Sequence, residues 1–351
     1  MLKNYFKIAW RNLWKNRFYT MLNVSGLASG LAVGILIFIW VEDELSYDNF
    51  HRHVANIYKI NSHLGTGTSA QVWSNAPSPL AVFCKESIPE VKDAVRIKER
   101  ENQLLFSYRD HKFLETSSAF VDPSFFSVFD FVLLKGNPVR PFLDAHSVIL
   151  TGSVAKKYFG DENPIGKILV ADNKENFTVS AVLKDFPENS SIHYNLLFPM
   201  SLFASNFQGN GEWKTIDQDL GNFMYSIFLQ LKQGASSDVV SRKISRIYRD
   251  KKGPDGKDDF FSLQSLKTLH LTTADGGSAA LQTVRIFLIV GILILLIACI
   301  NYVNLSTARS VIRSKEVSIR KIVGAARFQL LIQFFVESML LFALSSFLAL
   351  L

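Results

Sequence analysis

Cysteine is scarce in this chain of 351 residues, which has only Cys84 and Cys299. Cys299 lies in an apolar block and Cys84 lies far from it in a polar region, so no disulfide between them is expected. The sequence has no C-x-x-C pair, no G-x-S-x-G elbow, no H-E-x-x-H pair and no ATPase motif. We therefore predict no catalytic residue and no metal site in this chain.

Two stretches come near a functional motif and fall short of it. The seven histidines are scattered, and His51 and His53 form the one close pair, beside Asp48, without the further ligands that a metal needs. Residues 160–168 superficially resemble a phosphate-binding loop, but the spacing is one residue too long and Ile168 replaces the required Ser or Thr. We interpret the histidines as solvated surface and residues 160–168 as a turn.

Long uncharged runs are what the chain does have. The hydrophobic share of 48% is ordinary, but apolar residues gather in three blocks, at residues 21–41, 286–305 and 330–351. About 20 apolar residues cross a bilayer as a helix, so three transmembrane helices are predicted. Buried helices of a soluble protein are the alternative. For the first block a cleaved signal peptide is another alternative, but its long core, ending in residues 39–43, favours an uncleaved anchor.

Basic residues flank these blocks, and they account for the formal charge of +7 without a nucleic-acid partner. Lysine and arginine precede the first block and lie between the second and third, whereas acidic residues follow the first block. The positive-inside rule then places both basic stretches in the cytoplasm and residues 42–283 outside it. The third block ends the chain in a still apolar run, so we expect this sequence to be the N-terminal part of a longer protein.

The first 19 residues predict a helix that lies on the cytoplasmic membrane surface. Basic residues recur every four positions and form one stripe, and aromatic rings at its boundary suit the headgroup level. These interfacial anchor residues are Lys3, Lys7, Trp10, Arg11, Trp14 and Lys15. Leu2, Phe6, Ala9 and Leu13 form the opposite face. A merely solvated basic tail is the alternative, and it does not explain the tryptophans.

Small and polar residues inside the blocks predict helix packing. Gly26, Gly30 and Gly34 recur at a spacing of four, which lets another helix approach closely, and Asn301 and Asn304 share one side of the second block. Glu337, the one ionisable group inside a predicted span, is a functional candidate by default. Its position near the cytoplasmic end favours a structural role, either by snorkelling or by pairing with Arg327.

The region between the first two spans predicts a mixed α/β domain. Strand, helix and strand patterns occur at residues 56–64, 78–87 and 91–98, and again at 223–231, 238–248 and 259–271. These two β-α-β units could pair into one split α/β sheet. Residues 109–222 would then be an insertion rich in strands and turns.

The segment at residues 306–328 combines an apolar patch, formed by Val317, Ile319, Ile322 and Val323, with many basic residues. Gly324 and Ala325 indicate the end of a short helix there. A plain basic loop has no need of such a patch, so we predict that the helix docks into a groove on a cytosolic partner.

The stretch from Arg313 to Ala325, followed by Gln333, Glu337 and Ser338, resembles the signature of MacB/FtsX-type ABC permeases. Residues 1–60 resemble that family too, including ELSYDNFH at 44–51. The stretches at 122–138, 155–167 and 182–191 resemble the MacB-like periplasmic core domain. Together these motifs cover nearly the whole chain.

This resemblance implies a permease that works as a dimer, or with a second permease module, and with a separate cytosolic ABC ATPase. ATP and Mg²⁺ would be bound by that ATPase, and no cofactor by this chain. The resemblance also allows for periplasmic or outer-membrane components. It places the ATPase contact on Arg313, Lys315, Glu316, Ile319, Arg320, Lys321, Gly324 and Ala325.

The expected architecture is thus a membrane protein with transmembrane helices and a mixed α/β extracytoplasmic domain between the first and second spans. Its parts are an interfacial helix (1–19), a first span (20–41), the outer domain (42–283), a second span (284–305), a coupling segment (306–328) and a third span (329–351). A transmembrane receptor is the alternative function, but the third span begins only about 25 residues after the second, which leaves no room for an output domain. A membrane-bound enzyme has no support in the outer region.

Overall fold

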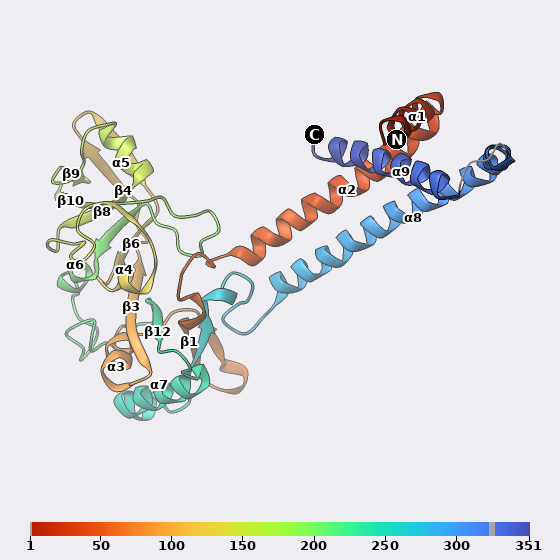
Figure 1. The fold of residues 1–351 in the computed structure, drawn as a ribbon. Coiled ribbons are helices and arrows are strands. Elements are labelled where there is room, and N and C mark those ends of the chain that lie inside the picture. The colour runs from red at the N-terminus through yellow and green to blue at the C-terminus, as the bar shows by residue number, and fades with distance from the viewer. Residues whose placement is uncertain (1, 323–326) are drawn as a thin grey trace. The chain divides into compact units, whose positions relative to one another are not determined.

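The structure, a computed structural model, describes residues 2–322 and 327–351, and within them the side chains other than those of 2–5, 309–316, 320–321 and 327. The chain divides into two compact units. Met1–Leu45 with Leu281–Leu351 form a helical unit, and Ser46–Ala280 form a unit that contains the β-sheet (Figure 1).

The helical unit consists of α1 (Leu2–Lys15), α2 (Arg17–Ser46), α8 (Ala279–Ile322) and α9 (Arg327–Ala349). In the described part of the chain, three stretches are long and apolar enough to cross a membrane, namely Arg17–Ser46, Ala279–Ala308 and Phe328–Ala349. With 44 residues, α8 is about 66 Å long, roughly twice the hydrocarbon thickness. It continues without a break past residue 305, where we expected the second span to end.

The second unit is built on one sheet of 13 strands. The strands are β1 (Ile57–Leu64), β2 (Gln71–Trp73), β3 (Val91–Glu99), β4 (Leu104–Tyr108), β5 (His111–Glu115), β6 (Ser118–Val121), β7 (Leu133–Lys135), β8 (Ser147–Thr151), β9 (Ile168–Ala171), β10 (Glu175–Leu183), β11 (Leu196–Pro199), β12 (Ser226–Leu231) and β13 (Phe260–Ser265). The helices of this unit are α3 (Pro79–Ser87), α4 (Phe125–Val128), α5 (Gly152–Phe159), α6 (Met200–Ser205) and α7 (Ser237–Lys252).

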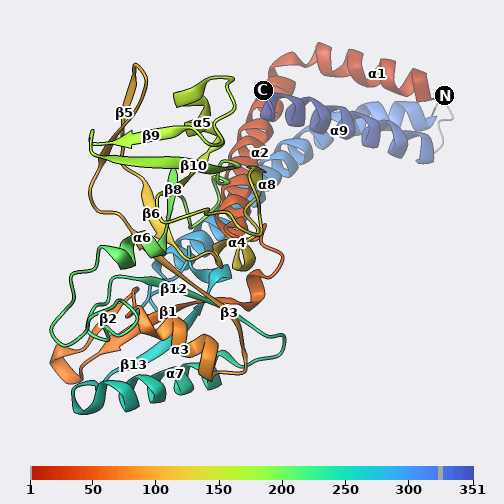
Figure 2. The same ribbon diagram turned by 90° about the vertical axis from the view of Figure 1, so that its left-hand side faces the viewer.

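The two predicted β-α-β units are present, as β1-α3-β3 and β12-α7-β13. Their four strands are neighbours in the order β13-β1-β12-β3, and every pair is antiparallel. This is the order of a split β-α-β fold, in which each unit contributes one central and one outer strand. Figure 2 shows α3 and α7 along one side of these strands.

The strands of the insertion extend the same sheet, in the order β6-β11-β8-β10-β9-β4-β5, and join it through β3 and β6. The insertion begins earlier than predicted, because β4 starts at Leu104 and already pairs with β9. The predicted turn at 160–168 links α5 to β9, and Gly160 has a φ of 58°, which a glycine adopts without strain.

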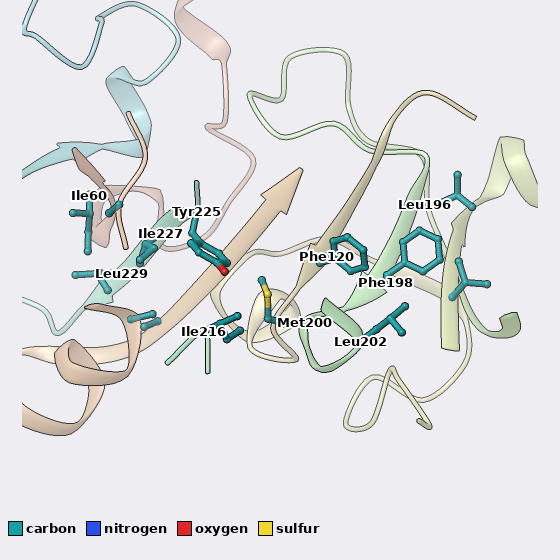
Figure 3. Packing of buried hydrophobic residues seen from close by; sticks show 14 of the residues in the cluster. Ile60, Phe120, Leu196, Phe198, Met200, Leu202, Ile216, Tyr225, Ile227 and Leu229 are labelled. Carbon is teal, nitrogen blue, oxygen red and sulfur yellow. The ribbon is translucent and has the colours of Figure 1, made fainter. Parts of the chain in front are cut away.

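Both faces of the sheet are covered by a core. Ile227 and Leu229 of β12 lie in one cluster and the intervening Phe228 lies in the other, because successive side chains of a strand point to opposite faces. The first cluster runs from Ile60 in the split β-α-β half to Phe198 in the insertion (Figure 3). The two halves therefore share one core.

Candidate functional site: a joint at the end of the first apolar helix

Three stretches that are distant in the sequence meet where α2 ends. They are residues 44–51, the aromatic run at 129–131 and the loop at 186–191, and all three fall within motifs that resemble the permease family. The contacts that join them are side-chain and backbone hydrogen bonds around Asp48 and His51. We refer to this group, residues 46–51 with 129–131 and 186–191, as the joint.

Asp48 directs the chain away from the helix into the domain. Its φ of 58° is the left-handed conformation that Asp tolerates better than most residues, and its side chain is fully buried. Its N–H donates to the Asn189 carbonyl at 2.9 Å, and its Oδ1 accepts from the Ser191 N–H at 2.9 Å. Asn189 Nδ2 in turn donates to Oγ of Ser46, the last residue of α2, at 2.9 Å. The turn after the helix is therefore held from both sides by one loop.

His51 fixes the second loop. Its Nδ1 accepts a hydrogen bond from the Asp130 N–H at 3.1 Å, so the proton of the neutral ring lies on Nε2. The ring is 1% exposed and lies edge-on to Phe131, with 5.0 Å between ring centroids. Burial lowers the pKa of His51 to about 4, although the charge of Asp130 opposes this shift. His51 is thus a neutral histidine at physiological pH.

Burial also disfavours the charged form of Asp48 in the joint. It raises the pKa of Asp48, while the hydrogen bonds from Ser191 act in the opposite direction. Among the residues that the structure describes, Oδ2 of Asp48 and Nε2 of His51 have no hydrogen-bond partner. Polar groups buried in this way lose water without full compensation, so these two atoms reduce the stability of the domain.

The chain leaving the domain passes the same place as the chain entering it. Tyr47 stacks on His270, with 3.5 Å between ring centroids and 5° between ring planes, and His270 lies nine residues before the start of α8. Leu266 and Leu269 belong to the same core face as Phe50 and Phe131. The first and last residues of this unit are thus packed against one another within it.

The comparisons with known proteins bear on this arrangement. The sequence profile of the MacB-like periplasmic core domain matches residues 20–247, which include the whole joint. The chain belongs to this family. It is a permease of the MacB/FtsX type, as its motifs predict. With the three apolar helices, the family identifies a membrane protein that carries a mixed α/β domain outside the cytoplasm.

The similar proteins are larger than this chain. The macrolide export ATP-binding/permease protein MacB of Aggregatibacter actinomycetemcomitans is 29% identical over 202 residues, which are 55% of this chain and 28% of that protein. MacB of Salmonella choleraesuis is 22% identical over 95% of this chain and 49% of its own length. The chain therefore spans half or less of the length of these relatives.

A solved domain of a Porphyromonas gingivalis protein assigned as a permease shares the fold. It has a TM-score of 0.53 and 20% identity, and the match covers 61% of this chain and 91% of that domain. At this identity the likeness concerns the fold alone.

In this MacB/FtsX-type permease, the predicted glycine stripe of α2 faces α8. A Cβ on Gly30 would lie 2.5 Å from Cβ of Ala298, and a Cβ on Gly34 would lie 2.7 Å from Cδ2 of Leu295. Gly26 lies beside Asn301, at 3.1 Å from the Cβ position to Nδ2, whereas Asn304 is exposed. Only glycine permits so short a separation between the two helices.

The predicted interfacial helix of this permease packs on α9. Ala9 and Leu13 of α1 are buried, and Asn12 Nδ2 donates to both carboxylate oxygens of Glu337, at 3.2 and 3.3 Å. Glu337 thus has a partner on α1 that the sequence did not indicate, and the side chain of Arg327 lies outside the described part. Lys7, Trp10, Arg11, Trp14 and Lys15 are exposed, and the side chain of Lys3 is not among those described.

The predicted ATPase contact falls mainly outside the described side chains. Those of Arg313, Lys315, Glu316, Arg320 and Lys321 are not described, and Gly324 and Ala325 lie outside the described residues. Ile319 and Ile322, two members of the predicted apolar patch, are 62% and 85% exposed on α8.

The joint is a candidate site that sequence reasoning missed. We interpreted His51 and His53 as solvated surface, which is correct for His53 and wrong for His51. No group of three or more metal-ligating side chains occurs in the described part of the chain. The available signal was the family resemblance of residues 44–51, 122–138 and 182–191, which did not reveal that they meet.

Proposed function

We propose that the chain is the permease subunit of an ABC transporter, in which ATP hydrolysis by a separate cytosolic ATPase moves the extracytoplasmic domain. The observation that supports this most is the joint. A domain that is to be moved by helices needs its connections fastened, and Asp48 and His51 fasten the end of α2 at the cost of buried polar groups.

The proposed arrangement has three spans in the cytoplasmic membrane, with residues 1–19 and 306–328 on the cytoplasmic side. The ATPase binds ATP and Mg²⁺ and contacts the segment around Ile319, whose exposed side chain offers an apolar surface among basic residues. A second permease copy or module completes the assembly, with the lipid bilayer around it and periplasmic or outer-membrane components beyond it.

The proposed substrate is handled on the outer side of the membrane. The relatives that match this chain are named for macrolide export. A domain that is displaced by helices could serve either the efflux of such compounds or the handling of an envelope substrate. The chain contributes movement in either case, and the chemistry of hydrolysis belongs to the ATPase.

Two variants test the proposal at its two ends. Glu316→Ala combined with Ile319→Asp removes the predicted ATPase contact, and we expect loss of ATPase capture in a pull-down with unchanged thermal unfolding of the outer domain.

Asp48→Ala loosens the joint, and we expect ATPase capture and ATP turnover to persist while export is lost. Full ATP turnover and export by the first variant would contradict the proposal, as would full export by the second.

A further inference from the structure

Beyond the proposed coupling, one surface of the outer domain has the features of a peptide-binding groove. A groove of about 680 Å³ lies between helix α7 and strand β13. Its helix side carries Arg242, Arg246 and Arg249, all three exposed, and its strand side is formed by residues 260–263. β13 is the outermost strand of the sheet, so one of its edges has no neighbouring strand among the residues that the structure describes.

The hydrogen bonds of β13 show which backbone groups face this free edge. The Phe261 N–H donates to Oγ of Ser245 on α7 at 2.9 Å, so it points away from β1. In an antiparallel pair, alternate residues direct both N–H and C=O to the same side. Leu263, two residues later, therefore directs its N–H and C=O to the same free edge, where the structure describes no backbone partner for them.

The positive charges of α7 determine which kind of strand could bind beside β13. Arg242, Arg246 and Arg249 recur at helical spacing on one face of α7, and among the described residues they form no ion pair. Lys243 also lines the groove but is paired with Glu90, and Asp238 is the one carboxylate in the lining. A second copy of the same edge would bring two arginine rows together, and like charges oppose that pairing.

We propose that this groove binds an extended acidic segment of a partner protein, which adds as a strand to β13. The open backbone of Leu263 supplies main-chain hydrogen bonds, and the arginines of α7 attract carboxylates on alternate side chains of the added strand. The proposal concerns the outer domain alone and holds whether or not the ATPase contact is placed correctly.

The test uses the full chain in phosphatidylcholine nanodiscs and a fluorescein-labelled octapeptide of Glu-Val repeats. Fluorescence anisotropy should show binding that weakens as salt is added. An octapeptide of Glu-Pro repeats carries the same charge but cannot form a ladder, and it should bind about tenfold more weakly. Arg242→Glu with Arg246→Glu should lower the affinity by about tenfold or more.

Two further variants separate the edge from general electrostatics. Leu263→Pro removes the free N–H at an edge position that tolerates proline, and it should also lower the affinity about tenfold. Lys156→Glu with Lys174→Glu changes the net charge by the same amount as the double arginine variant, but at exposed sites away from the groove. This control should leave binding unchanged.

Equal binding of the Glu-Pro and Glu-Val peptides, or no binding of either peptide, would overturn the proposal. Displacement of the bound peptide by phosphatidylglycerol vesicles in the wild type, together with an unaltered affinity of Leu263→Pro, would assign the surface to lipid.

Discussion

At the scale of single residues, the surroundings of a side chain decide whether it carries a charge. His51 is neutral because it is enclosed by aromatic rings, and Arg96 remains charged because carboxylates surround it. Burial alone would lower the pKa of Arg96, but the hydrogen bonds and charges of Asp122 and Asp217 raise it above the usual value. Both side chains link parts of the chain that are distant in the sequence.

The state of His51 predicts how stability depends on pH. Its pKa is about 4 in the folded protein and about 6.5 when unfolded, so below pH 6.5 the unfolded state binds a proton that the folded state does not. Stability should therefore fall with decreasing pH by up to about 1.4 kcal/mol per unit from this residue.

His51→Gln keeps an acceptor for the Asp130 N–H but does not titrate. Thermal unfolding of wild type and variant between pH 7 and pH 5 should therefore show the steeper loss in the wild type. Asp48, whose raised pKa has the opposite sign, is present in both proteins and does not affect the difference. Parallel pH profiles would show that His51 is not the titrating group.

Arg96 joins the two halves of the sheet, and its loss should be costly. Its guanidinium donates to both oxygens of Asp122 at 2.8 Å and to Ser78 Oγ at 2.8 Å, and it also pairs with Asp217. Arg96→Ala leaves the carboxylate of Asp122, whose side chain is 15% exposed, without its ion-pair partner, which should cost up to about 3–5 kcal/mol.

Arg52 provides the matched control, because it pairs with Asp130 at 3.5 Å while its side chain is 82% exposed. Arg52→Ala should change stability by less than about 1 kcal/mol. Chemical unfolding that follows the tryptophans of the outer domain, Trp73 and Trp213, measures both. Equal losses for the two variants would contradict a special role of Arg96.

At the scale of elements, the helical unit depends on close approach between α2 and α8. Gly30→Ala places a methyl group 2.5 Å from Cβ of Ala298, so the helices must separate, at about 1–3 kcal/mol. Helix propensity alone favours alanine by about 1 kcal/mol, so a loss of stability is diagnostic of packing.

The compensating change is Ala298→Gly, which reopens the space that the new methyl group needs. The double variant should recover most of the stability lost by Gly30→Ala in detergent, as a double-mutant cycle would show. Ser29→Ala, one residue away and exposed, should have little effect. Additive effects of the two changes would show that Gly30 and Ala298 are not in contact.

At the scale of the whole molecule, the proposed topology can be tested by labelling. The native Cys84 is buried and Cys299 lies in α8, so both are first replaced by alanine. A cysteine in place of the exposed Lys184 should react with a membrane-impermeant maleimide in intact cells. A cysteine in place of the exposed Ser318 should react only after permeabilisation. The reverse pattern would place the domain inside the cell.

Features that depend on neighbours in the sequence were predictable. A long uncharged run predicts a helix, because a helix satisfies the backbone hydrogen bonds of the segment internally. Alternation of apolar and polar residues predicts a strand, because successive side chains of a strand point to opposite faces. The helices around residues 21–41 and 286–305 and the four strands of the split β-α-β half follow from these local patterns. The insertion was predicted only as a region, since its short strands, such as β7 and β9, carry too few residues for a clear period.

Features that depend on distant partners were decided by tertiary structure alone. His51 became a buried neutral base because Phe129 and Phe131 fold over it, and Glu337 accepts hydrogen bonds from Asn12, which lies far from it in the sequence. The groove exists because β13 ends the sheet while α7 overhangs its edge. By itself the sequence determined the long apolar helices and the strands and helices of the split β-α-β half. Folding determined which polar groups lose water and which backbone edge stays open, because both depend on contacts between residues far apart in the chain.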